Sequence, residues 1–317
     1  MKNIISIFFY IILISGFLFT GCRKDGNGEI TDQQIMSGEL TGEINSDSIL
    51  SDINWLQNMG TRFALSANRK NVAVRIMNRF SGLGYSDVVL DSFLITTTWQ
   101  SNTYTMMEYN VIATIKGSES PDSISIVGAH YDNILSSNDP TILAPGANDN
   151  ASGVAATIEI ARAIKKINWS PKSTIRFVAF GAEERGLLGS ANYSAKAAAR
   201  MEGIKLMLNH DMIAYEPSND ISSWKVNIMD YDNSHSLREI AQEMCLKYTH
   251  LKFINVNTYN RNSDSYSFAR YGYKAIFFYN YSSDPNYHTL NDISSYCNPK
   301  YCAEIAKISC AILVNKD

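Results

Sequence analysis

The chain has 317 residues, of which 45% are hydrophobic and 19% are charged. This length and composition fit one large globular domain or two small ones, with enough apolar side chains for a sizeable core. The formal net charge of −3 gives no basic footprint, so we expect no nucleic-acid partner.

The N-terminus has the pattern of a secretion signal. Lys2 precedes the apolar stretch IISIFFYIILISGFLF, and a small residue followed by Cys22 resembles the lipobox of bacterial lipoproteins. Phe19 departs from that motif, which usually has an aliphatic residue there, and an ordinary signal peptide or a membrane anchor is the alternative. We expect residues 1–21 to be a lipoprotein signal peptide and Cys22 to be lipidated, which would anchor the protein to a bacterial envelope membrane outside the cytoplasm.

The next segment, residues 22–45, opens with the polar sequence CRKDGNGEITDQQ and is predicted to be a tether. The folded domain is then expected to span residues 46–317. From Ser46 onward apolar residues recur at helical spacing, which predicts a first helix. The segment NRKNVAVRIMNRFSGLGY predicts a second helix, which two glycines end.

Strands and helices alternate through the rest of the chain. Strand-like runs are DVVLDSFLITTTW, YNVIATIKG and SISIVGAH, followed by strands over residues 173–180, 204–212 and 273–281. Helical patterns cover residues 150–167, 190–201, 234–248 and 299–314. Strands that are apolar on both faces and separated by helices indicate a sheet covered on both sides. We therefore predict one α/β domain with a mixed, mainly parallel sheet and helices on both faces.

Polar side chains follow these strands at their carboxyl ends, where open α/β sheets gather their ligands. The residues are His130, Glu183, Glu184, Asp211 and, after a short loop, His288. Asp149 precedes a helix, where the N-terminal dipole favours a carboxylate. Each residue alone has a plainer explanation, such as a helix cap or a solvated turn, but their shared position favours a common site.

The residue types predict a metal centre. Two imidazoles and three or four carboxylates without a thiolate suit zinc or another borderline divalent ion. Five ligands exceed what one tetrahedral ion needs if a water position stays open. Two ions about 3.5 Å apart, bridged by a carboxylate and a water, would use all of them. His210, His235 and His250 are predicted to be structural or exposed.

The motifs together resemble a known family. The segments GAHYDN, PGANDNASGVAA, FVAFGAEERGLLGS, NHDMIAY and NYHTLND are similar, in order and spacing, to the signature segments of the bacterial leucyl aminopeptidase and aminopeptidase Y family. The likeness runs from about Ser46 to the C-terminus. It implies the three-layer sandwich of zinc exopeptidases, two zinc ions, and hydrolysis of the N-terminal residue of peptides with a free amino terminus.

The resemblance also implies a role for each residue of the site. Asp149 would bridge two zinc ions, His130 and Asp211 would complete one site, Glu184 and His288 would complete the other, and Glu183 would be the general base. Asp132 resembles the carboxylate that orients a histidine ligand, and Tyr287 resembles the hydroxyl that polarises the scissile carbonyl in some members. The peptide bond after Asp149 is often cis in this family.

Two departures from the family pattern leave all of these ligands in place. Ser265 stands where histidine is usual, which puts a contact near the substrate in doubt. Asn148 and Asn150 flank Asp149 where aspartate is frequent, and they reduce the local negative charge.

Three questions stay open. Glutaminyl cyclases share the fold and use one zinc, although they more often have Glu-Asp where this chain has Glu183-Glu184. A catalytically inactive, lipid-anchored binding protein is the other alternative. Pairing among Cys245, Cys297, Cys302 and Cys310 is not fixed by their spacing, although Cys297 and Cys302 are the closest couple in sequence.

Overall fold

The computed structural model describes residues 30–255, 259 and 261–317, and the expected signal peptide and Cys22 lie outside this part. No helix among the described residues is long and apolar enough to cross a membrane. The unit formed by Asp32–Asp317 holds all the elements below. Its helices are α1 Asp32–Gly42, α2 Ser46–Gln57, α3 Arg69–Gly82, α4 Ser152–Lys166, α5 Leu188–Ala199, α6 His235–Tyr248, α7 Ser265–Ala269 and α8 Pro299–Asn315, with short helical turns at Ala147–Ala151, Ile221–Ser223 and Ser294–Tyr296. Its strands are β1 Asp87–Trp99, β2 Asn102–Ile115, β3 Ser120–His130, β4 Ser173–Phe180, β5 Gly203–His210, β6 Lys225–Met229, β7 Lys252–Ile254 and β8 Ala275–Asn280.

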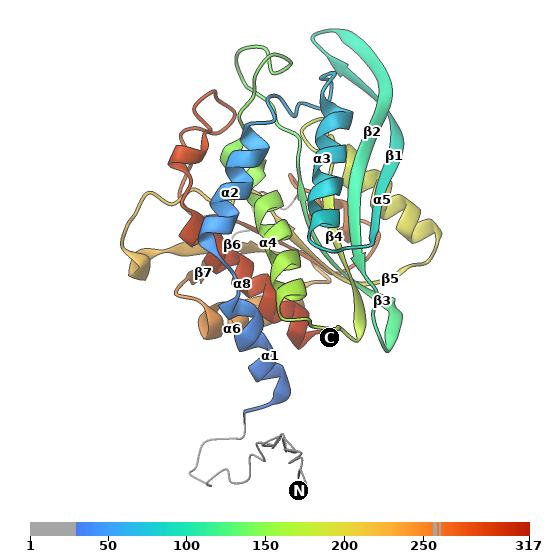
Figure 1. Cartoon of the computed structure of the whole chain (residues 1–317). Coiled ribbons are helices and arrows are strands. Elements are labelled where there is room, and N and C mark those ends of the chain that lie inside the picture. Colours follow the sequence, from blue (N-terminus) through green and yellow to red (C-terminus); the bar gives the residue numbers. More distant parts are fainter. Residues whose placement is uncertain (1–29, 256–258, 260) are drawn as a thin grey trace, which may run out of the picture. The chain divides into compact units, whose positions relative to one another are not determined.

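The strands of the described chain form one eight-stranded sheet in the order β1-β2-β4-β3-β5-β8-β6-β7 (Figure 1). The four central strands, β4, β3, β5 and β8, run parallel to one another. Antiparallel pairs flank them, β2 against β4 on one side and β6 against β8 on the other. The prediction of a mixed sheet with a parallel centre is confirmed.

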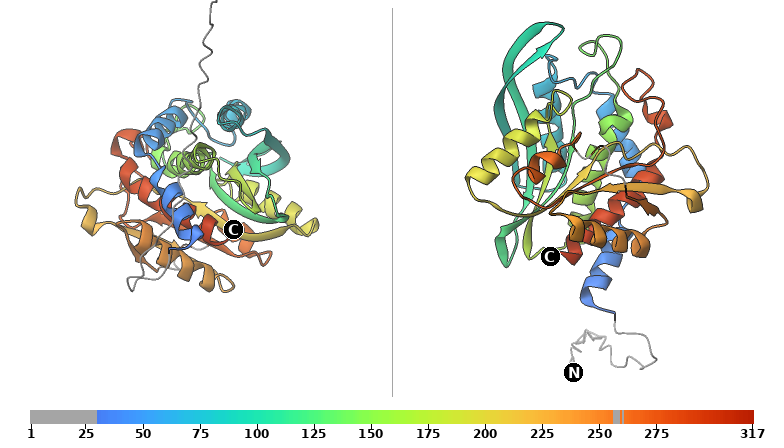
Figure 2. Two further views of the ribbon diagram at one scale, coloured as in Figure 1. Left: turned by 60° about the horizontal axis from the view of Figure 1, so that its bottom comes forward. Right: turned by 180° about the vertical axis from the view of Figure 1, so that it is seen from behind.

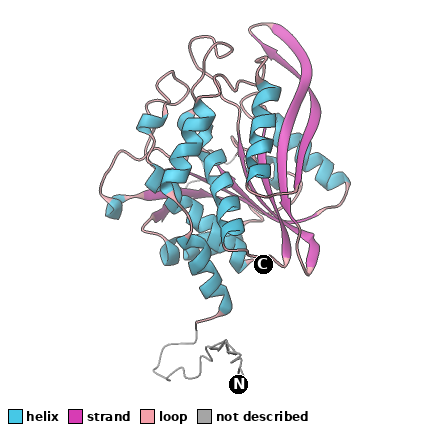
Figure 3. Ribbon diagram, in the orientation of Figure 1, coloured by secondary structure: helices cyan, strands magenta, loops and turns pink. Residues whose placement is uncertain are grey.

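Helices cover both faces of this sheet, as Figures 2 and 3 show. Phe177 and Ala179 of β4 belong to a large core cluster with side chains of α2, α3, α4, α6 and α8. The alternate residues Val178 and Phe180 belong to a second cluster, with Tyr193 of α5 and Phe268 of α7. Successive strand residues point to opposite faces, so an apolar run such as STIRFVAF supplies both cores. The predicted three-layer arrangement is confirmed.

The segment expected to be a tether, residues 22–45, differs from the prediction over its second half. Asp32–Gly42 forms α1, which packs against α8, and Leu40 is fully buried in the large core cluster. The sequence DQQIMSGELTG is mostly polar and has only a few apolar residues on one face, so its helical pattern is weak. Burial against α8, a tertiary contact, stabilises this helix.

Candidate metal centre

The parallel centre of the sheet brings the candidate residues to one edge. His130 is the last residue of β3, Asp211 directly follows β5, and Glu183 and Glu184 follow β4. His288 lies in the loop after β8. Because β3, β4, β5 and β8 run in the same direction, their carboxyl ends meet at this edge.

Asp149 lies between two histidines and presents one carboxylate oxygen to each. Its Oδ1 is 3.3 Å from Nε2 of His130, and its Oδ2 is 3.0 Å from Nε2 of His288. His130 Nε2 is also 3.2 Å from Oδ1 of Asp211, and His288 Nε2 is 3.1 Å from Oε1 of Glu184. The structure therefore joins the five residues into two groups that share Asp149.

Each group has the geometry of a metal site. The ligand atoms of His130, Asp149 and Asp211 lie within 4.8 Å of one another, and so do those of Asp149, Glu184 and His288. All five side chains are buried or half-buried. Imidazole nitrogens and carboxylate oxygens grouped in this way form a donor set that fits zinc.

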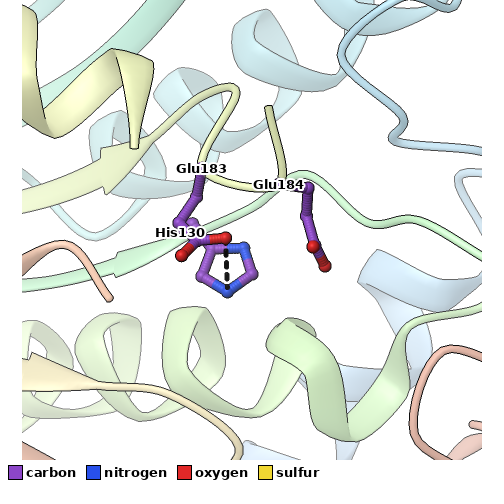
Figure 4. Close-up of side chains that lie close together, drawn as sticks. All are labelled: His130, Glu183 and Glu184. Carbon is purple, nitrogen blue, oxygen red and sulfur yellow. Dashed lines mark ion pairs between the residues drawn. The ribbon is translucent and has the colours of Figure 1, made fainter. Parts of the chain in front are cut away.

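Glu183 lies beside these two groups. Its Oε2 is 3.9 Å from Nε2 of His130, and a dashed line in Figure 4 marks this pair. His130, Glu183 and Glu184 also offer ligand atoms within 4.8 Å of one another. The geometry thus places Glu183 next to the shared space of the site without assigning its role.

The turn that carries the two glutamates is fixed by Asp132. Its Oδ1 accepts a hydrogen bond from the backbone N–H of Glu183 at 2.9 Å, and its Oδ2 accepts one from Glu184 at 3.2 Å. Nδ1 of His130 is 3.1 Å from the carbonyl oxygen of Asp132 and 3.6 Å from its carboxylate. Asp132 therefore orients the histidine with its backbone and the glutamate turn with its side chain.

Several backbone positions at the site lie in the left-handed region. Ala182, Met212 and His288 have φ values of 57°, 55° and 54°, and each is a proposed site residue or adjoins one. Non-glycine residues adopt this region at a free-energy cost, and they do so most often at functional sites. The peptide bond between Asp149 and Asn150 is cis, as the family resemblance implies.

Burial and crowding shift the protonation of these side chains. Burial raises the pKa of Glu183 well above its usual range, against the lowering effect of His130. Burial raises the pKa of Glu184 to about 7, and the neighbouring Asp149 carboxylate adds to the shift. Burial would also raise the pKa of Asp149, but hydrogen bonds from His130 and His288 hold it below its usual range. Carboxylates this close in a dry site need positive charge to offset them, which divalent cations supply.

A cavity of about 440 Å³ opens onto the candidate metal centre. His130, Asp149, Glu183, Glu184 and Asp211 line one side. The other walls are formed by aromatic and apolar side chains, Met212, Tyr259, Phe277, Tyr279, Tyr281 and Tyr287, with Asn262, Asn280, Ser282, Ser283 and Asp284 between them. The cavity therefore combines a charged end with a largely apolar wall.

Other residues singled out in the sequence lie outside the two groups. Nε2 of His210 is 2.8 Å from the hydroxyl oxygen of Ser309 on α8, so His210 has the structural role expected of it. His235 pairs with Asp230, and His250 pairs with Glu304. Ser265, where the family has histidine, has its hydroxyl 2.9 Å from that of Tyr231. The four cysteines of the described chain, Cys245, Cys297, Cys302 and Cys310, are free thiols.

Two residues at the site carried no assignment from the sequence. Ser263 donates a hydrogen bond to Oδ2 of Asp211 at 2.6 Å, and Asp292 accepts backbone N–H groups of the segment that carries Asp149. Ser263 lies two residues before Ser265, and Asp292 ends the motif NYHTLND, but nothing in the spacing distinguishes them from ordinary turn residues. Only the folded chain shows what they contact.

Comparison with known proteins agrees with the geometry. Residues 110–313 match the model of peptidase family M28. A probable zinc metalloprotease of Pyrenophora tritici-repentis is 33% identical over 65% of this chain and 50% of its own length, so the chain spans about half of that relative. A probable leucine aminopeptidase of Arthroderma otae is 27% identical over 85% of this chain and 72% of its own length. The crystal structure of LapB from Legionella pneumophila has the same fold, with a TM-score of 0.75 and 23% identity, covering 91% of this chain and 76% of that chain. The chain therefore belongs to peptidase family M28.

Proposed function

We propose that this protein is a zinc-dependent aminopeptidase that removes N-terminal residues from peptides. The observation that carries this proposal is the position of Asp149, whose two carboxylate oxygens face two different histidine groups. A shared carboxylate between two such groups suits a pair of divalent ions. The relative of Arthroderma otae, which bears the name leucine aminopeptidase, supports the same activity.

Under this proposal the two groups hold two zinc ions. His130 and Asp211 would bind one ion, Glu184 and His288 the other, and Asp149 would bind both. Such a pair of ions lowers the pKa of a shared water and polarises a peptide carbonyl. Asp132 keeps the ligands in place through the glutamate turn and His130.

Glu183 would be the general base. Its carboxylate is buried beside His130, and the proposed ligand set leaves it free to exchange a proton. It would accept a proton from the attacking water and deliver it to the leaving amine. Tyr287 lines the same cavity, and burial raises the pKa of its hydroxyl, which therefore stays protonated and can donate to the carbonyl oxygen.

The cavity supports a substrate with a free amino terminus and an apolar first side chain. The substrate's α-amino group would meet the charged end, where Glu183 is the carboxylate that this proposal does not assign to an ion. The aromatic wall, including Phe277 and Tyr279, would bury a large apolar or aromatic side chain. A blocked amino terminus would lose this contact because an acylated nitrogen carries no charge.

A panel of aminoacyl-p-nitroanilides, with and without a zinc chelator, tests this function. We expect chelator-sensitive hydrolysis that favours leucyl and phenylalanyl substrates over glycyl and that is lost with an acetylated amino terminus. Atomic emission should give two zinc ions per chain. Cleavage of acetylated substrates at the same rate, or cyclisation of a glutaminyl peptide in place of hydrolysis, would contradict the proposal.

We also propose that the enzyme is lipid-anchored through Cys22 on the outside of the cytoplasmic compartment. The support is the sequence itself, in which an apolar stretch ends at a small residue and a cysteine, and a polar segment follows.

A further inference from the structure

Arg62, in the segment between α2 and α3, is fully buried at the base of the metal centre. Its guanidinium donates four hydrogen bonds, all to backbone carbonyl oxygens. Nε donates to Tyr131 at 2.8 Å, Nη1 to Pro145 at 2.9 Å and to Leu56 at 3.2 Å, and Nη2 to Gly146 at 2.6 Å. Burying a charged group in this way is costly unless neighbouring groups offset it.

Three of these four carbonyls, those of Tyr131, Pro145 and Gly146, belong to the two segments that carry the shared site, and the fourth, Leu56, lies in α2. Tyr131 lies directly between His130 and Asp132, and Pro145 and Gly146 begin the turn that leads to Asp149. Gly146 has a φ of 53°, and a Cβ there would lie 2.9 Å from Nη2 of Arg62. The guanidinium thus ties the end of β3 to the turn before α4, two segments that the sheet alone does not join.

Asp292 binds the backbone N–H groups of the same turn, whereas Arg62 binds its carbonyl oxygens. Its Oδ1 accepts the backbone N–H of Asn148 at 2.7 Å, and its Oδ2 accepts that of Asp149 at 3.0 Å. The carbonyl oxygen of Asp292 also accepts the N–H of Ala147 at 3.0 Å. Asp292 stands four residues after His288, so it couples the loop of the second histidine to the segment of the shared carboxylate.

The charges of the two residues complement each other. Burial lowers the pKa of Arg62 to about 10, while the carboxylates of Asp292, Asp132 and Asp149 act to raise it. The guanidinium is therefore still a cation at neutral pH. The carboxylates that favour its charge lie at the metal centre or beside it, and Asp292 has the largest effect, although burial raises the pKa of Asp292 itself to about 7.

We propose that Arg62 and Asp292 are positioning residues that clamp residues 145–149, Arg62 through the carbonyls and Asp292 through the amides, and thereby set Asp149 between the two histidines. The clamp rests on the proposed function, because it assigns Asp149 to both metal ions. Lysine cannot replace Arg62, since its single ammonium lacks the planar fork that reaches Tyr131 and Gly146 together. Partners that orient metal ligands in this way typically change metal affinity about 10- to 100-fold when they are mutated.

The zinc affinity of the folded protein distinguishes a positioning role of Arg62 and Asp292 from a role in stability alone. We would measure it for R62K and D292N by competition with a chromophoric chelator at low temperature, where circular dichroism shows each variant to be folded. Both variants should bind zinc about 10- to 100-fold more weakly than the wild type. Their activity should recover as free zinc is raised, because the variants weaken binding while the ligands and the base remain present.

R162K is the matched control. The guanidinium of Arg162 on α4 donates hydrogen bonds to the carboxylate of Glu159 and to the carbonyl oxygen of Glu43, away from the metal centre. R162K should keep wild-type zinc affinity even if its melting temperature falls. If R62K and D292N lower the melting temperature and yet bind zinc within about twofold of the wild type, the clamp is overturned.

D292N keeps the proposal testable if R62K does not fold, because it removes the acceptor charge and leaves the guanidinium contacts intact. In the double variant the losses should be less than additive, since both residues act on residues 145–149. A wild-type protein that binds no zinc would overturn the proposed function itself, whereas two zinc ions with unchanged affinity in both variants would overturn only the clamp.

Discussion

Glu183 and Glu184 are neighbours in the chain, yet their carboxylates face different partners. Glu184 lies 3.1 Å from His288 and belongs to one metal group, whereas Glu183 lies 3.9 Å from His130, beside the other group. The backbone N–H groups of both residues are bound by the one carboxylate of Asp132. The turn is therefore rigid, and its two side chains can serve different functions.

Replacement of Glu183 tests this division. Glu183→Ala should keep both zinc ions and lose about 10²- to 10⁴-fold in kcat, the usual loss for a general base, with a much smaller change in KM. Steady-state kinetics and metal analysis of the same preparation measure both. Glu239→Ala, at an exposed position on α6, serves as the control with unchanged kinetics. A Glu183→Ala enzyme with full activity on aminoacyl anilides would show that another group is the base.

Glu108 gives the protein a pH-dependent stability that does not involve the metal ligands. It is fully buried on β2, its Oε1 accepts a hydrogen bond from Tyr131 at 2.9 Å, and burial raises its pKa from about 4.5 to about 8. Below pH 4.5 the carboxyl is protonated in both states. As the pH rises toward 8, the unfolded chain releases a proton that the folded chain retains, so the free energy of unfolding falls.

We therefore expect Glu108→Gln to be more stable than the wild type at pH 8 and to lose this advantage near pH 5. The difference should grow by up to about 1.4 kcal/mol per pH unit across this window. Urea denaturation of both proteins at pH 5 and pH 8 measures it, and the comparison cancels groups common to both. An equal difference at the two pH values would mean that Glu108 is ionised in the folded protein.

At the scale of the element, the first turn of α4 decides whether the site can form. Gly153 lies so close to β5 that a Cβ would be 2.3 Å from the carbonyl oxygen of His210 and 2.5 Å from Oδ1 of Asn150. The helix that follows Asp149 can therefore approach the strand that precedes Asp211. This approach is what brings the two carboxylates near the same histidine.

Gly153→Ala should push α4 away from β5 and weaken both folding and zinc binding. Overpacking of this kind costs about 1–3 kcal/mol, and the displaced Asp149 should lower zinc content in addition. The control is Gly82→Ala at the end of α3, where the added methyl meets open space and should leave stability and zinc content nearly unchanged. Thermal melts and metal analysis of the two variants make the comparison, and equal behaviour would refute the packing argument.

The helices and strands differ in how well their sequence patterns predict them. The runs over β3, β4 and β8 are apolar and bounded by turns, so their existence and type follow from the pattern. β6 and β7 have only five and three residues, too few for any periodicity, and they form because β8 offers β6 an edge to pair with. Helix α1 likewise depends on α8 for its burial.

At the scale of the whole molecule, we expect the lipid anchor to decide where the protein is located and to leave its activity unchanged. We expect the wild-type protein in the membrane fraction and Cys22→Ser in the aqueous fraction with the same specific activity, because the catalytic unit begins after the anchor. Cys297→Ser is the matched control and should stay with the membrane. Fractionation and incorporation of labelled palmitate measure this, and a Cys22→Ser protein that still pellets with membranes would disprove the anchor.

The sequence by itself determined the longer strands and helices and which polar residues stand at strand ends, because both are local properties of hydrophobic period and order. It thereby singled out His130, Asp149, Glu183, Glu184, Asp211 and His288. Only the tertiary structure decided that β3 lies between β4 and β5, and that Arg62 and Asp292 meet the turn before Asp149 from two sides. Those contacts join residues 84 and 143 positions apart, and no local pattern encodes a contact between loops that only the packing of the whole chain brings together.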